Sequence, residues 1–164
     1  MIDNKTGKTK YYEYGRYHTN DVTKGKVRKV KIPDVKIKDG KPTEESLNIV
    51  LKTISDDAGH HGNIDGAYID SDEFEKMNNY AIKKYQESNP IVGGENYKKD
   101  REEYDITSNN CATFAADVVN QDENVKRPLL VFDKSPKNMV SEYQDEGYKK
   151  VFFDSKKNQT KIDE

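Results

Sequence analysis

The chain contains one cysteine, Cys111, which directly follows three residues that commonly cap helices, Ser108, Asn109 and Asn110. This spacing places the thiol in or beside the first turn of a predicted helix, where unpaired backbone N–H groups and the helix dipole favour a thiolate. The same amides can hold the oxyanion that forms when a thiolate attacks a carbonyl. Any covalent catalysis by this chain must therefore use Cys111. Position alone, however, favours the simpler interpretation of a small buried apolar residue.

A cysteine nucleophile needs a base, which is usually a histidine. The chain has three histidines, His18, His60 and His61. His18 ends a tyrosine-rich predicted strand, so it can lie on a sheet that faces the helix carrying Cys111. His60 and His61 lie in a glycine-flanked predicted loop, where neighbouring histidines usually bond to water.

Metal sites have weaker support in the sequence. One segment has the glycine and the spacing of a calcium loop, but a histidine replaces its first carboxylate and an aspartate replaces the closing glutamate; its members are His61, Asn63, Asp65, Gly66 and Asp72. A zinc site built from His60, His61 and Cys111 lacks paired-ligand spacing. We therefore expect neither a metal nor an organic cofactor.

Composition indicates a small folded domain with a lean core. The chain has 164 residues, enough for a single domain, and we expect residues 154–164 to form a loose, charged tail. Only 32% of the residues are hydrophobic and 35% are charged, but eleven tyrosines and five phenylalanines supply the large buried surfaces that a disordered chain lacks. The net charge of −2, with interspersed signs, argues against a nucleic-acid partner.

The chain has no apolar run long enough for a signal peptide or a membrane span. We expect a protein that is cytoplasmic or is secreted by a route without a cleaved signal peptide.

The periodicity of the sequence predicts an α+β fold, with a small antiparallel sheet packed against about four helices. Helices are expected after Thr43, after a capping box at 70–73, at Cys111 and after Ser135-Pro136. Predicted strands cover 10–17, 25–33, 67–69, 104–106, 129–132 and 148–153. The turn at 3–8 leads into the first strand with only Met1 and Ile2 before it, so these two residues form a stub of an edge strand or the first half of a hairpin is absent.

Two segments together resemble known proteins. The tyrosine-rich strand Tyr11–Tyr17, with a Gly-x-Val-Arg at Gly25–Arg28, resembles effector-type domains of bacterial toxins. The segment Asn-Asn-Cys-Ala-Thr-Phe-Ala at 109–115 is similar to the helix start of circularly permuted papain-like enzymes, which include NlpC-type cell-wall amidases and the lecithin retinol acyltransferase group. The resemblance extends over roughly residues 8 to 145 and implies a permuted papain-like core.

This resemblance implies roles for particular residues. Cys111 matches the nucleophile, and Glu13 on the tyrosine-rich strand is the best match for the residue that orients the base. The family places its catalytic histidine on a strand before residue 8, where this chain has no histidine. Either His18 substitutes for it, or the strand that carries the base is missing and the domain is inactive.

Two hypotheses follow. The first is a bacterial effector that works as a cysteine hydrolase or acyltransferase on a peptide or acyl substrate, such as a cell-wall peptide, with Cys111, His18 and Glu13 as catalytic residues. The second is an inactive or truncated relative that binds a partner, as an immunity or accessory protein does.

Overall fold

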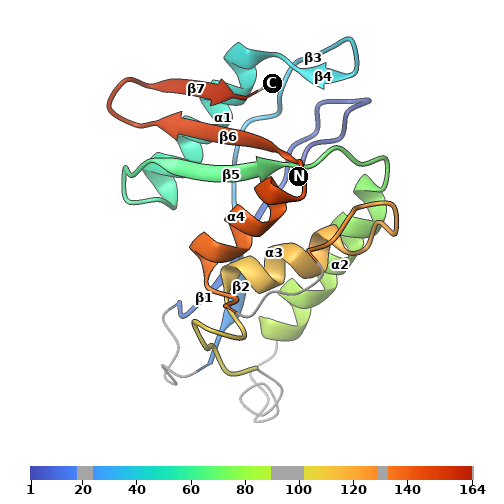
Figure 1. The fold of residues 1–164 in the computed structure, drawn as a ribbon, viewed down its shortest axis with the longest axis vertical. Helices are drawn as coiled ribbons and strands as arrows, with labels where there is room; N and C mark the ends of the chain where they lie inside the picture. The colour runs from blue at the N-terminus through green and yellow to red at the C-terminus, as the bar shows by residue number, and fades with distance from the viewer. Residues whose placement is uncertain (18–23, 90–101, 129–132, 164) are drawn as a thin grey trace.

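The computed structural model describes residues 1–17, 24–89, 102–128 and 133–163. Within these ranges it has the predicted α+β fold, with four helices (Figure 1). The single sheet expected from the sequence is divided into three small antiparallel sheets, two of them two-stranded and one three-stranded.

The tyrosine-rich segment forms one strand of a hairpin. β1 (Tyr11–Gly15) pairs antiparallel with β2 (Lys26–Val30), so that Glu13 lies opposite Arg28. Ahead of β1, Ile2 forms an antiparallel bridge with Thr9, as expected if Met1 and Ile2 are the stub of an edge strand.

The two faces of β1 have different surroundings because side chains alternate along a strand. Tyr12 and Tyr14 point to the face covered by α2 (Phe74–Ser88), and Tyr12 donates a hydrogen bond from its hydroxyl to Asn78 Oδ1 (3.0 Å). Tyr14 joins the buried core of this half of the molecule, together with Val27, Met77, Ala81, Phe114 and Val118. Tyr11 and Glu13 share the opposite face.

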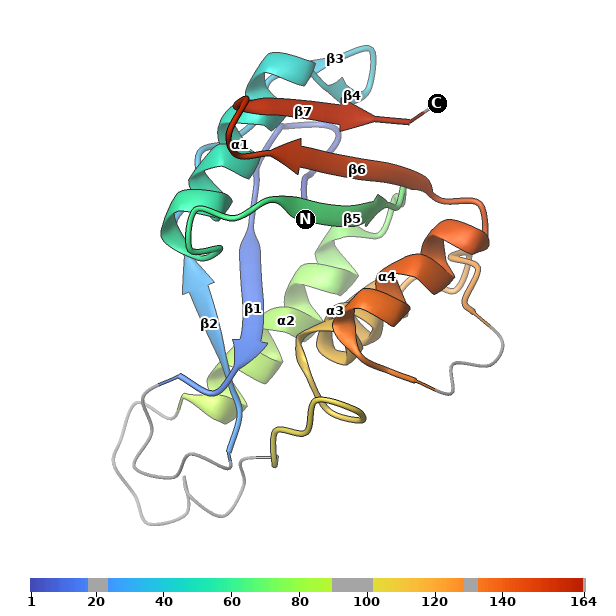
Figure 2. The same ribbon diagram turned by 60° about the vertical axis from the view of Figure 1, so that its left-hand side comes forward.

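The other half of the molecule consists of α1 and the remaining strands. A short hairpin, β3 (Ile37–Lys38) with β4 (Lys41–Pro42), precedes α1 (Glu44–Asp57). The helix packs on a three-stranded sheet of order β5-β6-β7, formed by Ile64–Tyr68, Lys149–Asp154 and Gln159–Ile162 (Figure 2).

The prediction that residues 154–164 form a loose tail is wrong for most of that segment. After a turn, β7 pairs with β6, and the buried Thr160 donates a hydrogen bond from its hydroxyl to Asn48 Oδ1 (2.8 Å) on α1. The pairing with β6 satisfies the backbone of a segment whose polar composition gives no strand signal.

All four predicted helix starts are confirmed, including that of α2 at Phe74, directly after residues 70–73. Thr43 caps α1 and accepts a hydrogen bond from the Ser46 amide. α3 (Cys111–Val119) begins after Asn110, and α4 (Pro136–Asp145) begins after Ser135 with proline at its start, as the sequence predicts.

The capping box expected at 70–73 does not form. α2 begins at Phe74 without a side-chain cap; the Ser71 hydroxyl accepts a hydrogen bond from the Glu73 amide (3.1 Å) and donates one to Asp122 Oδ2 (2.5 Å). The strand predicted at 104–106 is a turn with an isolated bridge from Asp105 to Asn109, and the strand predicted at 129–132 lies outside the described residues. None of the described helices is both long and apolar enough to cross a membrane.

Candidate functional site

Asn110 fixes the start of the helix that carries Cys111. Its side chain is fully buried, and its Oδ1 accepts hydrogen bonds from the amides of Ala112 (2.8 Å) and Thr113 (3.2 Å). The Asn110 amide in turn donates to the Thr113 hydroxyl, which completes a capping box.

The side-chain amide of Asn110 also joins two other segments of the chain. Nδ2 donates to the carbonyl oxygens of Ile106 and Lys134, each at 2.8 Å. The residue before the cysteine therefore connects the turn that precedes α3 to the segment that precedes α4.

The cap determines which amides remain available to a substrate. The amides of Ala112 and Thr113 bond to Asn110 Oδ1, and that of Phe114 bonds to the Asn110 carbonyl. Within the described ranges, the Cys111 amide has no oxygen acceptor. Of the first-turn amides that the sequence predicts as donors to an oxyanion, the Cys111 amide is therefore the one that remains available in the described part of the chain.

The Cys111 thiol is half-buried at the first position of α3. Burial raises its pKa, and the amides of Ala112 and Cys111 oppose that rise to a smaller extent. The protonated thiol is thus favoured, contrary to the preformed thiolate expected from a position at a helix start. Attack on a carbonyl would require a base to remove the proton at that step.

Three tyrosines lie near the Cys111 thiol, two from the β1 segment and one from the segment before α3. Burial is the main cause of the raised pKa of Tyr11, Tyr17 and Tyr104, and the negative charge of a Cys111 thiolate raises each of these pKa values further. Their phenol groups therefore lie within electrostatic range of the sulfur. The alternation Tyr11, Glu13, Gly15, Tyr17 is the sequence signal that Tyr11 and Tyr17 share a face with Glu13, whereas no local pattern indicates Tyr104.

Glu13 is held in place by its own neighbours. Its carboxylate forms an ion pair with Arg28 directly across the hairpin and accepts a hydrogen bond from the Tyr11 hydroxyl (2.9 Å). The Arg28 guanidinium in turn lies 4.2 Å from the centre of the Tyr17 ring. This network lies on the face of β1 that carries Tyr11, and it links Glu13 to two of the tyrosines around Cys111.

Two of the three histidines, His60 and His61, belong to the described part of the chain. His18 lies outside the described residues, directly after Tyr17. His60 and His61 lie in the exposed turn after α1, and His61 Nδ1 is 3.1 Å from Asp56 Oδ1. Among the described residues, no histidine ring forms a hydrogen bond with the Cys111 thiol.

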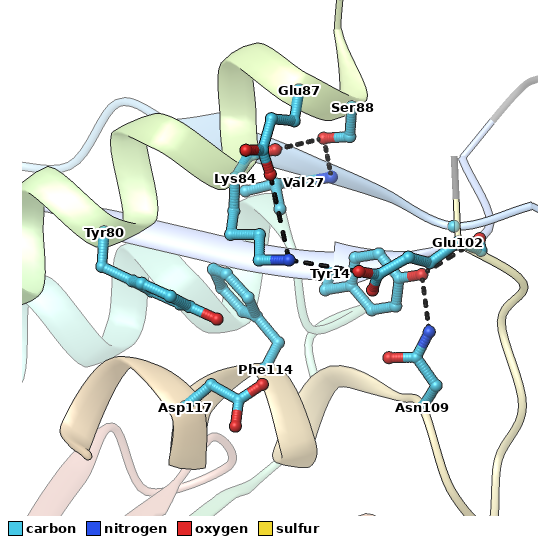
Figure 3. Close-up of a pocket in the computed structure, with 11 residues that line it drawn as sticks. Tyr14, Val27, Tyr80, Lys84, Glu87, Ser88, Glu102, Asn109, Phe114 and Asp117 are labelled. Atoms are coloured by element: carbon cyan, nitrogen blue, oxygen red, sulfur yellow. Dashed lines mark hydrogen bonds and ion pairs between the residues drawn. The ribbon is translucent and has the colours of Figure 1, made fainter. Parts of the chain in front are cut away.

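A small pocket lies between α2 and α3 (Figure 3). Cys111 is not among the residues that line it. Lys84 crosses it to form ion pairs with Glu102 (3.1 Å) and Glu87 (3.9 Å). Asn109 Nδ2 donates to the Tyr14 hydroxyl (3.3 Å). The volume of about 50 Å³ holds only a few waters. These contacts anchor the segment that leads to Cys111, and the pocket is too small for a substrate.

Comparison with known proteins points to one kind of protein. The family model described as type VI secretion system effector TseH-like matches residues 1–127. The crystal structure of the type VI secretion system effector TseH is similar with a TM-score of 0.80 and 32% sequence identity, over 99% of this chain and 84% of that chain. No curated protein sequence matches.

Proposed function

The chain belongs to the TseH-like family of type VI secretion system effectors, and on this premise we propose that it is a papain-like cysteine hydrolase that cleaves amide bonds, such as those of cell-wall peptides. The observation that carries the proposal is the placement of Cys111 at the first position of a capped helix, with its own amide free of oxygen acceptors in the described part of the chain. Type VI delivery would export the protein without a cleaved signal peptide. A cognate immunity protein is the expected partner in the producing cell.

The reaction would proceed through a thioester. The base removes the Cys111 proton as the sulfur attacks the carbonyl carbon, and the Cys111 amide donates a hydrogen bond to the oxyanion. When the carbon–nitrogen bond breaks, the base returns the proton to the leaving amine. Water then attacks the thioester, releases the acid and restores the thiol.

His18 is our proposed base. It directly follows Tyr17, whose phenol lies within electrostatic range of the Cys111 sulfur. Glu13 shares a strand face with Tyr11, so it would act on His18 from within the Glu13–Arg28–Tyr11 network and not as a free carboxylate.

The alternative is an effector that binds its target without cleaving it. The raised pKa of Cys111 and the engagement of Glu13 by Arg28 favour this second function. The two functions differ in whether a covalent acyl-enzyme forms.

The test is digestion of purified cell-wall peptides by the full chain, followed by mass spectrometry. We expect new amine and carboxylate ends, and a loss of rate of at least roughly 100-fold in both Cys111→Ala and His18→Ala. His61→Ala is the matched control, because the His61 ring contacts Asp56 at the surface, and it should retain the wild-type rate. Unchanged cleavage by Cys111→Ala would overturn the mechanism, and intact peptides with no thioester adduct on wild type would favour the binding function.

A further inference from the structure

An apolar cavity of about 350 Å³ lies between the two halves of the molecule. α1, β5, the start of α2 and the segments flanking β1 and β2 line it. Most of the lining side chains are aliphatic, and they include Ile32, Leu47, Val50, Ile54, Ile64 and Met77. We call this space the inner chamber.

A second space of about 330 Å³, the outer chamber, adjoins the first. Leu47, Tyr68 and Asp70 line both chambers, so the two volumes meet at these residues. Together they form an extended space that is suited to a chain more than to a compact ring system.

Two lysines and one aspartate line the outer chamber, so its lining carries a net positive charge. Lys41 and Lys149 line it, and neither forms an ion pair with a carboxylate in the described part of the chain. Asp70, where the chambers meet, accepts a hydrogen bond from Asn4 Nδ2 (3.0 Å). An anionic group in the outer chamber would therefore face two available ammonium groups.

The inner chamber is hollow beside Gly66, where a residue with a side chain would fill part of it. The chamber is partly open to solvent, so its aliphatic lining lacks the stabilisation that close packing and full burial give. Gly66 on β5 lines the chamber on the same strand face as Ile64 and Tyr68, and a Cβ added at Gly66 would meet no atom within 4 Å. A strand glycine beside an apolar void preserves space that a ligand can occupy.

From these observations we propose that the two chambers bind an anionic amphiphile with one acyl chain, with the chain in the inner chamber and the acidic head between Lys41 and Lys149. At about 30 Å³ for each small group, the inner chamber holds roughly ten methylenes. The aliphatic lining supplies apolar burial without fixed polar contacts, as a flexible hydrocarbon requires.

The acyl site adjoins the Cys111 site through one side chain. Tyr11 lines the inner chamber, and its hydroxyl donates to Glu13 in the network near Cys111. Binding of the amphiphile does not require the proposed hydrolysis, so Cys111→Ser should bind it with unchanged affinity.

Calorimetric titration of the full chain with dodecanoate, below its micelle concentration, tests the inner chamber. Wild type should bind one equivalent. Gly66→Ile should abolish the binding, because the new side chain occupies the chamber. It should also raise the melting temperature, because isoleucine fills the space and is a residue type that strands favour. Leu51→Phe, which fills the chamber from α1, is the second variant and should also abolish binding.

A charge-reversed pair of variants tests the outer chamber. Lys41→Glu combined with Lys149→Glu should weaken dodecanoate binding roughly tenfold while leaving binding of the neutral dodecanol unchanged. Lys161→Glu is the matched control: Lys161 lies on β7 outside both chambers, so its reversal should leave the affinity unaltered.

A parallel titration with phosphatidylglycerol vesicles distinguishes the source of the ligand. Binding of dodecanoate alone supports a free fatty acid, and binding of vesicles, blocked by Gly66→Ile, supports the acyl chain of a membrane lipid. If wild type binds neither probe while Gly66→Ile still raises the melting temperature, the chamber is a packing defect and the proposal is overturned.

Discussion

At the scale of single residues, burial and the helix start act in opposite directions on the Cys111 thiol. Desolvation disfavours the thiolate, while the amides of Ala112 and Cys111 favour it. Desolvation is the larger effect, so the thiol is the favoured form in the folded protein. The reactive form would then depend on a base that acts during the attack.

This balance predicts the pH dependence of alkylation. The rate of Cys111 alkylation by iodoacetamide should rise with a midpoint above the value of about 8.5 that is typical of free cysteine. Unfolding in urea removes the burial and should lower the midpoint to that value. A midpoint below that of the unfolded chain would contradict this prediction and indicate a thiolate paired with a cation.

The Glu13–Arg28 ion pair gives a second prediction at this scale. Arg28→Met leaves the mostly buried Glu13 carboxylate without its cation and should lower the free energy of unfolding by about 2 kcal/mol. Glu13→Gln combined with Arg28→Met should recover most of the loss, because no unpaired charge remains. Urea denaturation measures both, and a double variant as unstable as the single one would show that Arg28 acts through packing on Tyr17.

At the scale of elements, the start of α3 is more extensively fixed than an ordinary capped helix. Asn110→Ala should lower the free energy of unfolding by about 3 kcal/mol, since it removes the cap and two further hydrogen bonds to the carbonyl groups of Ile106 and Lys134. Thr43→Ala removes only the cap of α1 and should cost about 1 kcal/mol. Equal losses in urea denaturation would contradict the role of Asn110 in joining three segments.

The helices were predictable because their signals are local. Thr43 and Asn110 cap α1 and α3, and Ser135-Pro136 begins α4, since these start signals depend only on the residues of one turn. The start of α2 after residues 70–73 was also predictable, but the contact of Ser71 with Asp122 was not, because Asp122 lies 51 residues away in the sequence.

The strands and the site depended on long-range pairing. β7 is polar, and it forms because β6 offers a free edge, which no local pattern reveals. The placement of Cys111 at a helix start followed from its preceding residues. The ion pair between Glu13 and Arg28 could be predicted only with the register of the β1–β2 hairpin, which places the two residues opposite each other. Once that register is assumed, their opposite charges indicate the pair.

At the scale of the whole molecule, buried phenols should limit stability in alkali. Burial raises the pKa of tyrosines in both halves, namely Tyr11, Tyr12, Tyr17, Tyr68, Tyr80, Tyr104 and Tyr143. The unfolded chain ionises these groups near pH 10, and the folded chain ionises them at higher pH. Their stabilising contribution is complete below about pH 10 and is lost as the pH rises through the folded values.

The free energy of unfolding should therefore fall steeply above about pH 10, while tyrosinate absorbance of the folded protein lags behind that of the urea-unfolded chain. Urea denaturation across this range, with absorbance recorded on the same samples, measures both quantities. Coincident tyrosine titrations of the folded and unfolded chains would contradict the burial of these phenols.

The pairing of β5 with β6 also sets an order of assembly during synthesis. Ile64 pairs with Phe153, so β5 must wait for a partner that the ribosome adds 89 residues later. Such distant pairing slows folding, because a long loop must close before the contact forms. The nascent chain can complete the β1–β2 hairpin and α2 early, whereas α1 and β5 keep their apolar faces uncovered until the C-terminal strands emerge. A chaperone that binds this intermediate would recognise the same aliphatic surface that lines the inner chamber.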